Sequence, residues 1–304
     1  KPRARHSSKE LGRRLARRAG LSVLAVALFL LSLPARAALA DELPVVVTQP
    51  WIALIVSFLG GPNVAVRSLL IWNDAGDPVR AEGGRALRNL PADACIVALD
   101  SADLAGSGLK AGAYGKLRTL YNPFPIPPER WDASLPDPSV MPFVAQRVLT
   151  VLADWDPQNY LYYQRRLAEF QARLSSSVLA GRQVLRDVRV CDLSGASSAL
   201  LRAAGCRMER PDLHLLDSWS RSSPKQLQEF LEERIAQGVV LVMDGGTPRN
   251  LRHFLGGRPE VFNFARPPLN QDYPAFLNEQ YISLWQKITA KPPAGRKPDA
   301  PRSR

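Results

Sequence analysis

The sequence predicts an α/β protein with two lobes, each built on a parallel sheet, joined by one long backbone helix, with a ligand cleft between the lobes. In both halves of the 304-residue chain, short β-branched runs alternate with stretches typical of helices. The runs lack strict apolar/polar alternation, as expected of parallel strands covered on both faces. We place an N-terminal lobe at residues 41–153, a bridging helix at 154–181 and a C-terminal lobe at 182–290.

The N-terminal half predicts three buried strands joined by helices. The strands are Pro44 to Thr48, Val64 to Leu70 and Cys95 to Leu99. One helix is expected from Trp51 to Leu59, ended by Gly60-Gly61, and another from Ala81 to Leu90. The proline-rich stretch 121–142 lacks periodicity and predicts a loop.

The bridging helix has the clearest pattern. Asp156 is a favourable N-cap and Pro157 suits the first helical position. Apolar residues then recur at spacings of three and four, at Tyr160, Tyr163, Leu167, Phe170, Leu174 and Val178. We expect Gly181 to end the helix. Residues 157–180 would extend about 36 Å, enough to cross from one lobe to the other.

The second half repeats the alternation. Strands are expected at 188–191, 206–209, 239–243 and 261–264. Helices are expected from Ser197 to Ala204, from Pro224 to near Gly238, after Thr247-Pro248, and from the cap Asp272 to Ile288.

The formal charge of +12 is confined to the two ends of the chain. Residues 1–40 carry nine basic and one acidic residue, and residues 291–304 carry five and one. Of the 40 basic and 28 acidic residues, 26 of each remain in the body, which is therefore neutral. We expect no nucleic-acid partner, and a disordered basic tail at 291–304.

The first 40 residues match a secretory signal peptide. Arg13, Arg14, Arg17 and Arg18 precede an apolar run from Leu21 to Leu33, and small-residue cleavage patterns follow near residues 35–40. An uncleaved anchor is the alternative, but the run is shorter than the about 20 residues that span a bilayer. We expect a periplasmic protein, with secretion from a Gram-positive cell as the alternative.

Three cysteines, Cys95, Cys191 and Cys206, are expected in an oxidising compartment. Cys95 lies inside a buried run and reads as a small apolar residue. For Cys191 and Cys206 two alternatives remain, a cross-strand disulfide or two free thiols.

With these elements in place, the chain resembles the zinc- and manganese-binding solute-binding proteins of ABC importers, the cluster A-I group. The resemblance covers 43–288 through three motifs: Pro44 to Thr48 with Gly60-Gly61-Pro62-Asn63-Val64, Asp154 to Tyr163 with Phe170 and Leu174, and Asp272-Tyr273 to Ile288. It implies two α/β lobes bridged by one helix, and a metal held between them by three histidines and a carboxylate.

Carried over position by position, the resemblance puts the ligand-pocket residues at Val79, Ser139, Ser194 and Asp244. The family's "DPH" motifs are Asp77-Pro78-Val79 and Asp137-Pro138-Ser139 here, and Ser194 takes the third histidine position. Asp244 keeps the carboxylate and is the only retained metal candidate. Valine and serine are poor transition-metal ligands, so we expect no tight binding of bare zinc or manganese.

The remaining residues favour a polar cleft. Ser139, Ser194 and Asp244, with Gly195, Gly245 and Gly246, could hydrogen-bond a small polar solute or a metal already bound by a chelator. The segment 192–198 between a strand and a helix could bind an anion, or Ser197 or Ser198 could simply cap the helix. The two mature histidines, His214 and His253, are expected on the surface.

These observations predict a monomeric solute-binding component that delivers its solute to an inner-membrane ABC permease. We expect no certain cofactor, a metal or metal chelate being the transported ligand. We expect no enzyme, because Ser194-Gly195 lacks a nucleophile elbow and a convincing histidine base. The alternative function is a scaffold that has lost solute capture and docks on an envelope transporter.

Overall fold

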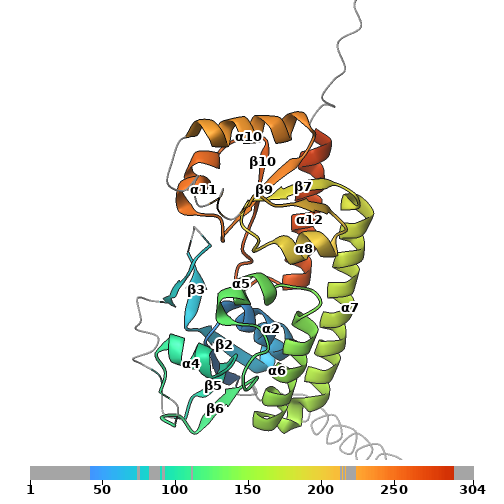
Figure 1. The fold of residues 1–304 in the computed structure, drawn as a ribbon. Coiled ribbons are helices and arrows are strands. Elements are labelled where there is room, and N and C mark those ends of the chain that lie inside the picture. The colour runs from blue at the N-terminus through green and yellow to red at the C-terminus, as the bar shows by residue number, and fades with distance from the viewer. Residues whose placement is uncertain are drawn as a thin grey trace, which may run out of the picture. The chain divides into compact units, whose positions relative to one another are not determined.

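A computed structural model describes residues 42–73, 76–81, 90, 93–110, 112–212, 214, 216 and 224–290 (Figure 1). The predicted signal peptide, the predicted tail and most of the predicted helix at 81–90 lie outside the described residues. Within them, no helix is long and apolar enough to cross a membrane.

The N-terminal lobe contains the predicted parallel sheet. Its strands are β1 (Leu43–Val47), β2 (Val64–Ser68), β5 (Cys95–Ala98) and β6 (Lys116–Thr119), in the order β2-β1-β5-β6. Helices α2 (Pro50–Gly60), α4 (Ser101–Ser107) and α6 (Met141–Trp155) belong to this lobe. Every residue of β5 is buried, which explains why the run shows no alternation.

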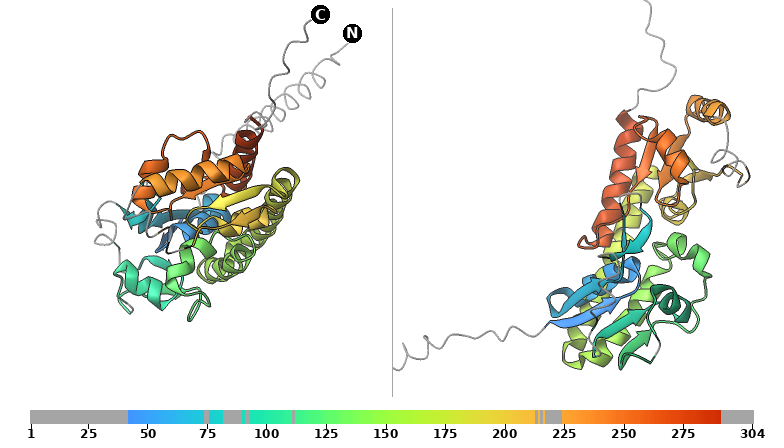
Figure 2. Two further views of the ribbon diagram at one scale, coloured as in Figure 1. Left: turned by 45° about the horizontal axis from the view of Figure 1, so that its top comes forward. Right: turned by 90° about the vertical axis from the view of Figure 1, so that its left-hand side faces the viewer.

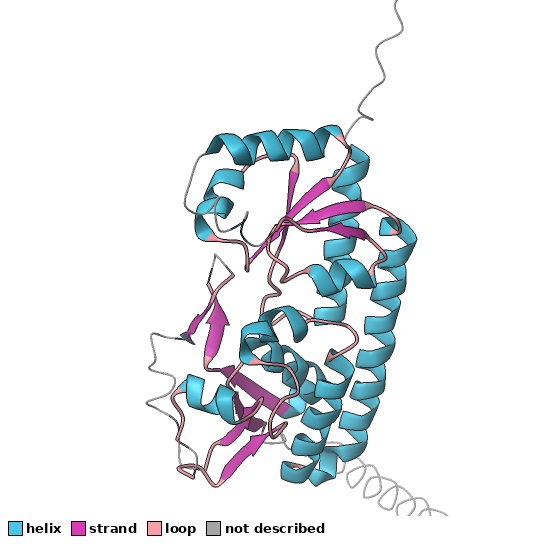
Figure 3. Ribbon diagram, viewed as in Figure 1, coloured by secondary structure: helices cyan, strands magenta, loops and turns pink. Residues whose placement is uncertain are grey.

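The C-terminal lobe contains a second parallel sheet in the order β10-β9-β7-β8. Its strands are β7 (Arg189–Asp192), β8 (Arg207–Glu209), β9 (Val240–Asp244) and β10 (Val261–Phe264). Its helices are α8 (Ser198–Ala203), α10 (Pro224–Ala236) and α11 (Arg249–Leu255). Figure 3 shows the two groups of strands, one in each lobe. The prediction of two α/β lobes is confirmed.

The long helix α7 (Tyr160–Leu185) runs past both lobes, beside the final helix α12 (Tyr273–Ala290) (Figure 2). It continues four residues beyond Gly181, where the sequence predicted its end. At this glycine the ring of Tyr281 lies so close that an added Cβ would be 2.5 Å from Cδ2. Gly181 therefore permits close helix packing instead of ending the helix.

One apolar core connects the lobes. It includes Val47 of the first sheet, Phe170 of α7, Tyr281 of α12 and Val242 of the second sheet, all almost completely buried. Separate clusters cover the other face of each sheet. Because the backbone helices share a core with both sheets, they hold the lobes in a defined relation.

The two predicted helix caps differ in outcome. Asp272 accepts a hydrogen bond from the Ala275 amide at 3.0 Å, as an N-cap does. Asp156 makes no capping bond; its Oδ2 accepts from the Tyr163 hydroxyl and from Asn159 Nδ2. A short 3₁₀ turn, Pro157–Asn159, starts the helical segment there.

The proline-rich stretch 121–142 is not simply a loop. It contains a 3₁₀ turn (Pro128–Arg130) and the short helix α5 (Trp131–Ser134), and α6 begins at Met141. Trp131 is buried, and its Nε1 donates to the Ile126 carbonyl at 2.7 Å. Pro142 occupies the first turn of α6, where proline is tolerated.

A small antiparallel hairpin, β3 (Leu70–Trp72) and β4 (Pro78–Arg80), was not predicted. Its turn is closed by Asn73, whose carbonyl accepts from Gly76 N at 2.8 Å and whose Oδ1 accepts from Asp77 N at 2.9 Å. The run expected as one strand, 64–70, therefore divides between the sheet and this hairpin. The hairpin extends from the N-terminal lobe toward α11 (Figure 1).

All three cysteines are free and buried. In the β7–β8 pairing Cys191 lies opposite Glu209, so it does not face Cys206 across the strands. Burial raises the pKa of the Cys191 and Cys206 thiols to about 12. The two thiols stay separate and protonated at neutral pH.

Candidate functional site: a cavity lined by arginines

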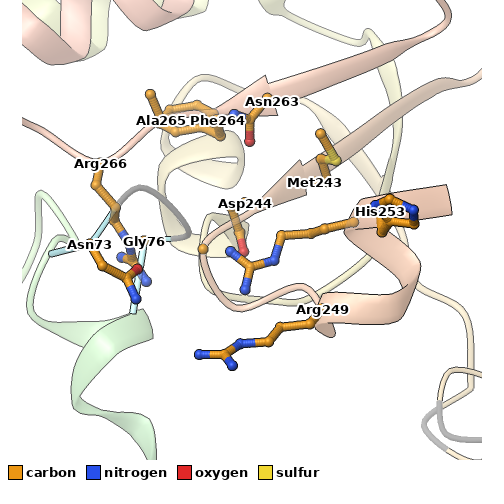
Figure 4. Close-up of a pocket in the computed structure, with 12 residues that line it drawn as sticks. Asn73, Gly76, Met243, Asp244, Arg249, His253, Asn263, Phe264, Ala265 and Arg266 are labelled. Atoms are coloured by element: carbon orange, nitrogen blue, oxygen red, sulfur yellow. The ribbon is translucent and has the colours of Figure 1, made fainter. Parts of the chain in front are cut away.

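A cavity of about 540 Å³ lies at the carboxyl ends of β9 and β10. On one side three segments of the C-terminal lobe line it: Met243 to Gly245, α11, and Asn263 to Arg266. On the other side it is lined by Asn73 and Gly76 of the hairpin. Ligands of open α/β sheets commonly bind at this edge. We call this space the arginine cavity, after Arg249, Arg252 and Arg266 in its wall (Figure 4).

Asp77 joins the hairpin to α11 through two ion pairs. Its Oδ2 accepts from Arg249 at 3.0 Å, and its Oδ1 lies 3.6 Å from Arg252 Nη2. Partial burial by itself would raise the pKa of Asp77. The Arg249 hydrogen bond and the charges of Arg252 and Arg249 outweigh that effect and hold it below its usual value of 3.8.

Arg266 is fixed more firmly than the other two arginines. Its guanidinium donates to Asp132 of α5 and lies 5.5 Å from the Trp51 ring centroid. The side chain is only 11% exposed. Its Nε is buried and has no hydrogen-bond partner within the described part of the chain, an unusual state for a buried donor.

Two glycines bring the hairpin and the β9 loop into contact. Gly76 has a φ of +81°, and an added Cβ would lie 2.8 Å from the Cα of Gly245. A Cβ at Gly245 would lie 2.9 Å from the Gly76 carbonyl oxygen and 2.8 Å from Arg266 Nε. Backbone therefore touches backbone here, and Gly245 packs closely against Arg266 Nε.

Asp244, the retained carboxylate, is 3% exposed and holds two loops of the C-terminal lobe together. Its Oδ1 accepts from the Ser194 hydroxyl and from Gly246 N at 2.8 Å. Its Oδ2 accepts from Ser197 N at 2.8 Å and from Ser197 Oγ at 2.6 Å. Both oxygens are already engaged by the chain's own donors.

Asp192 organises the neighbouring loop in the same way. Its Oδ1 accepts from the amides of Ser194 and Gly195 at 3.0 and 2.9 Å, and its Oδ2 accepts from the Ser198 hydroxyl. Ser197 occupies the N-cap position of α8, one of the two expectations for this segment, but its side chain makes no capping hydrogen bond. The hydroxyls of Ser197 and Ser198 instead donate to Asp244 and Asp192, because a buried carboxylate needs hydrogen-bond donors and these are the nearest.

The structure does not bring the four sequence-predicted pocket residues into one cavity. Val79 lies on β4 and is 37% exposed. Ser139 is exposed, with its hydroxyl donating to Asp137 Oδ1 at 2.7 Å, and borders a groove beside α7. Ser194 lines a different cavity of about 380 Å³, and of the four only Asp244 lines the arginine cavity.

A transition-metal centre is not evident in the described ranges, which contain no group of three or more His, Cys, Asp or Glu side chains able to hold a metal ion. His214 and His253 are both exposed, as predicted. His253 also lines the arginine cavity, a position that the sequence analysis did not predict.

Sequence reasoning missed the arginines and Asp77. Arg249 and Arg252 are three residues apart on a helix that directly follows the buried strand β9, so they share one face. That spacing could have predicted a pair of arginines at the carboxyl end of the sheet. Arg266 carried no such signal, because its place depends on the contact between α5 and the segment after β10.

No protein-family model matches the chain, and no curated protein matches it. Solved structures do match. The crystal structure of ZnuA has a TM-score of 0.59 at 16% identity, covering 82% of this chain and all of that one. FpvC, a solute-binding protein from Pseudomonas aeruginosa in complex with Mn²⁺, gives 0.54 at 17% identity over 82% and 99% of the two chains.

The laminin-binding protein Lmb of Streptococcus agalactiae, described as an adhesin with metal-transporting activity, gives a TM-score of 0.54 at 15% identity, covering 81% of this chain and all of that one. At such identities the likeness shows a shared fold. The two lobes and the long bridging helix are thus those of this group of solute-binding structures.

Proposed function

We propose that this chain is the exported solute-binding component of an importer related to metal uptake. It captures a small polar solute, such as a metal held in a chelator, in the arginine cavity and delivers it to an ABC permease in the inner membrane. The observation that carries the proposal is a cavity of about 540 Å³ at the strand ends, lined by three guanidinium groups and a single imidazole, that of His253.

The chemistry of the wall argues against capture of a bare transition metal. Zn²⁺ and Mn²⁺ need imidazole, thiolate or several free carboxylates in a fixed geometry. Among the described residues the cavity presents three arginines, one imidazole, that of His253, and one carboxylate, Asp244, whose two oxygens are occupied by Ser194, Ser197 and Gly246. Cationic groups repel a bare cation, whereas a chelated metal can present an anionic or polar surface.

The similar folds support the importer part of the proposal. ZnuA in one of its structures has zinc bound, FpvC binds Mn²⁺ and Ni²⁺, and Lmb has metal-transporting activity. These properties belong to those proteins. We infer the same class of task here, with a different ligand chemistry at the site.

A scaffold without a solute is the second candidate function. The Asp77 pairs with Arg249 and Arg252 link the two lobes through the chain's own charges, as a protein that has lost solute capture could do. Catalysis is not proposed, because the hydroxyls of Ser194 and Ser197 donate to Asp244, and within the described residues neither is hydrogen-bonded to a histidine base.

Thermal unfolding of the purified protein tests the proposal. The panel contains Zn²⁺, Mn²⁺, their citrate complexes, free organic acids and neutral sugars. A solute that binds only the folded state stabilises it by about 2.7 kcal/mol at 100 times its dissociation constant. We expect a large shift with a chelate or polar solute and none with the bare ions. A large shift with bare Zn²⁺ contradicts the proposal, and no shift with any ligand favours the scaffold.

A further inference from the structure

We propose that the solute is an anion with at least two carboxylate or phosphate groups, bound by Arg249, Arg252 and Arg266, and that Asp77 occupies the first two arginines until the solute arrives. This inference rests on the proposed function and names the chemical class of its solute. It is carried by the origin of the charges, the looseness of the Asp77–Arg249 contact and the fixed position of Arg266 in the cavity wall.

The three cavity arginines and the carboxylates that pair with them come from different lobes. All three arginines come from the C-terminal lobe: Arg249 and Arg252 from α11, and Arg266 from the segment after β10. Their carboxylate partners, Asp77 and Asp132, both come from the N-terminal lobe. One wall is therefore cationic, and guanidinium forks match carboxylate and phosphate groups in shape as well as charge.

Asp77 is held in a way that permits displacement. Arg249 is 77% exposed, and the Arg252 contact, at 3.6 Å, is too long for a hydrogen bond. All three residues of β4, which follow Asp77, are exposed. An ion pair to an exposed side chain such as Arg249 contributes little to stability. A solute with two anionic groups can form more ion pairs and hydrogen bonds with the arginines than the single Asp77 carboxylate that it replaces.

Arg266 provides a second, rigid anchor. Asp132 and the Trp51 ring fix its guanidinium, so binding an anion requires little further ordering. Its guanidinium lines the cavity and can donate to an anion there, whereas Nε itself is buried against Gly245. Figure 4 shows Arg249 and Arg266 reaching the cavity from two different segments, so two groups of one solute can be bound at once.

Asp244 does not oppose this assignment. Among the described residues it is the only carboxylate in the cavity wall, and its charge is shared among four donors from Ser194, Ser197 and Gly246. The exposed amide side chain of Asn263 adds polar lining beside the arginines.

Calorimetric titration of the full chain with citrate, free and as its zinc complex, tests the inference. Four variants are compared with the parent: Arg249→Gln, Arg252→Gln, Asp77→Asn and the control Arg207→Gln. Arg207 is 70% exposed and pairs with Asp187, so it matches Arg249 in exposure and pairing but lies on β8, away from the cavity. Because Arg249 is highly exposed, its variant keeps the fold even if Arg252→Gln destabilises the protein.

We expect citrate binding to weaken about tenfold or more in Arg249→Gln and Arg252→Gln. It should tighten about three- to tenfold in Asp77→Asn, because a competing carboxylate is gone, and stay unchanged in Arg207→Gln. Equal affinity in all five proteins overturns the inference, and so does weaker binding in Asp77→Asn. If a neutral sugar binds tightly while citrate does not, the anion class is wrong and solute capture stands. If neither binds, both proposals fall.

Discussion

Asp77 of the β3–β4 hairpin and Arg249 of α11 pair at 3.0 Å although they are 172 residues apart in sequence. The contact links the N-terminal lobe to the helix that follows the buried strand β9. This ion pair lies at the cavity that Arg252 and Arg266 also line. The Asp77 carboxylate therefore occupies the position where we expect a carboxylate or phosphate group of the solute. The hairpin and α11 therefore meet at the cavity that both of them line.

The close approach of Gly76 and Gly245 predicts that the hairpin tolerates no side chain at Gly76. In Gly76→Ala the new Cβ would meet Gly245 Cα at 2.8 Å, in a left-handed backbone conformation. Gly112→Ala is a matched control, because its φ is +83° and nothing lies within 4 Å of the added Cβ. We expect the control to lose about 1–2 kcal/mol of unfolding free energy from backbone strain alone.

Gly76→Ala should lose more than that control, and amide exchange in the hairpin should become faster, because the interlobe contact is also disrupted. Urea titration and hydrogen exchange measure the two effects. Equal losses with unchanged exchange in the hairpin would contradict the contact.

The four hydrogen bonds to Asp244 predict a structural role that does not depend on any metal. Asp244→Ala leaves the donors of Ser194, Ser197 and Gly246 without their acceptor, which should cost about 3 kcal/mol or more. The exposed Asp154→Ala serves as the control and should change stability by less than about 0.5 kcal/mol. Urea unfolding with EDTA present makes the measurement, and a fully stable Asp244→Ala protein would refute the role.

The lowered pKa of Asp77 predicts the direction of a pH effect. A carboxyl whose pKa lies lower in the folded protein than in the unfolded chain adds stability above the unfolded value, here about 3.8. That contribution is lost as the pH falls through the lowered folded pKa. The carboxyl chemical shift of Asp77 should therefore titrate below 3.8, and Arg249→Gln should move the midpoint upward. A midpoint at or above 3.8 in the parent would disprove the ion pairs.

Gly181 predicts a packing limit between α7 and α12. Gly181→Ala forces its Cβ to within 2.5 Å of the Tyr281 ring and should cost about 1–3 kcal/mol. Gly106→Ala in α4, where nothing lies within 4 Å, should be neutral or slightly stabilising. Thermal unfolding compares the two. A stabilised Gly181→Ala protein would show that the helices pack less closely than described.

The fold could be predicted further than the site because its signals are local. The runs that became β1, β5 and β9 are visible as nearly unbroken apolar stretches, and the stripe from Tyr160 to Val178 reveals α7. The misplaced end at Gly181 reflects a contact with Tyr281, which is 100 residues away and outside any local pattern.

The site depends on such distant contacts throughout. Asp244 could be predicted because it ends a buried strand. The four donors that bind it could not be predicted, because they come from other parts of the chain or from a turn. The arginine cavity exists because the hairpin meets α11 and α5 meets the segment after β10, contacts that no spacing encodes. The assignment of Val79, Ser139 and Ser194 as ligand-pocket positions stays a prediction. We place the solute instead beside Arg249 and Arg252.

The central claim is that the cavity binds an anionic solute and not a bare metal. Equilibrium dialysis of the purified protein against zinc alone, citrate alone and zinc citrate, with bound zinc and citrate measured separately, tests it most directly. We expect the protein to retain citrate, with or without zinc, and not to retain zinc alone. Stoichiometric retention of zinc in the absence of citrate, unaffected by Arg252→Gln, would contradict it.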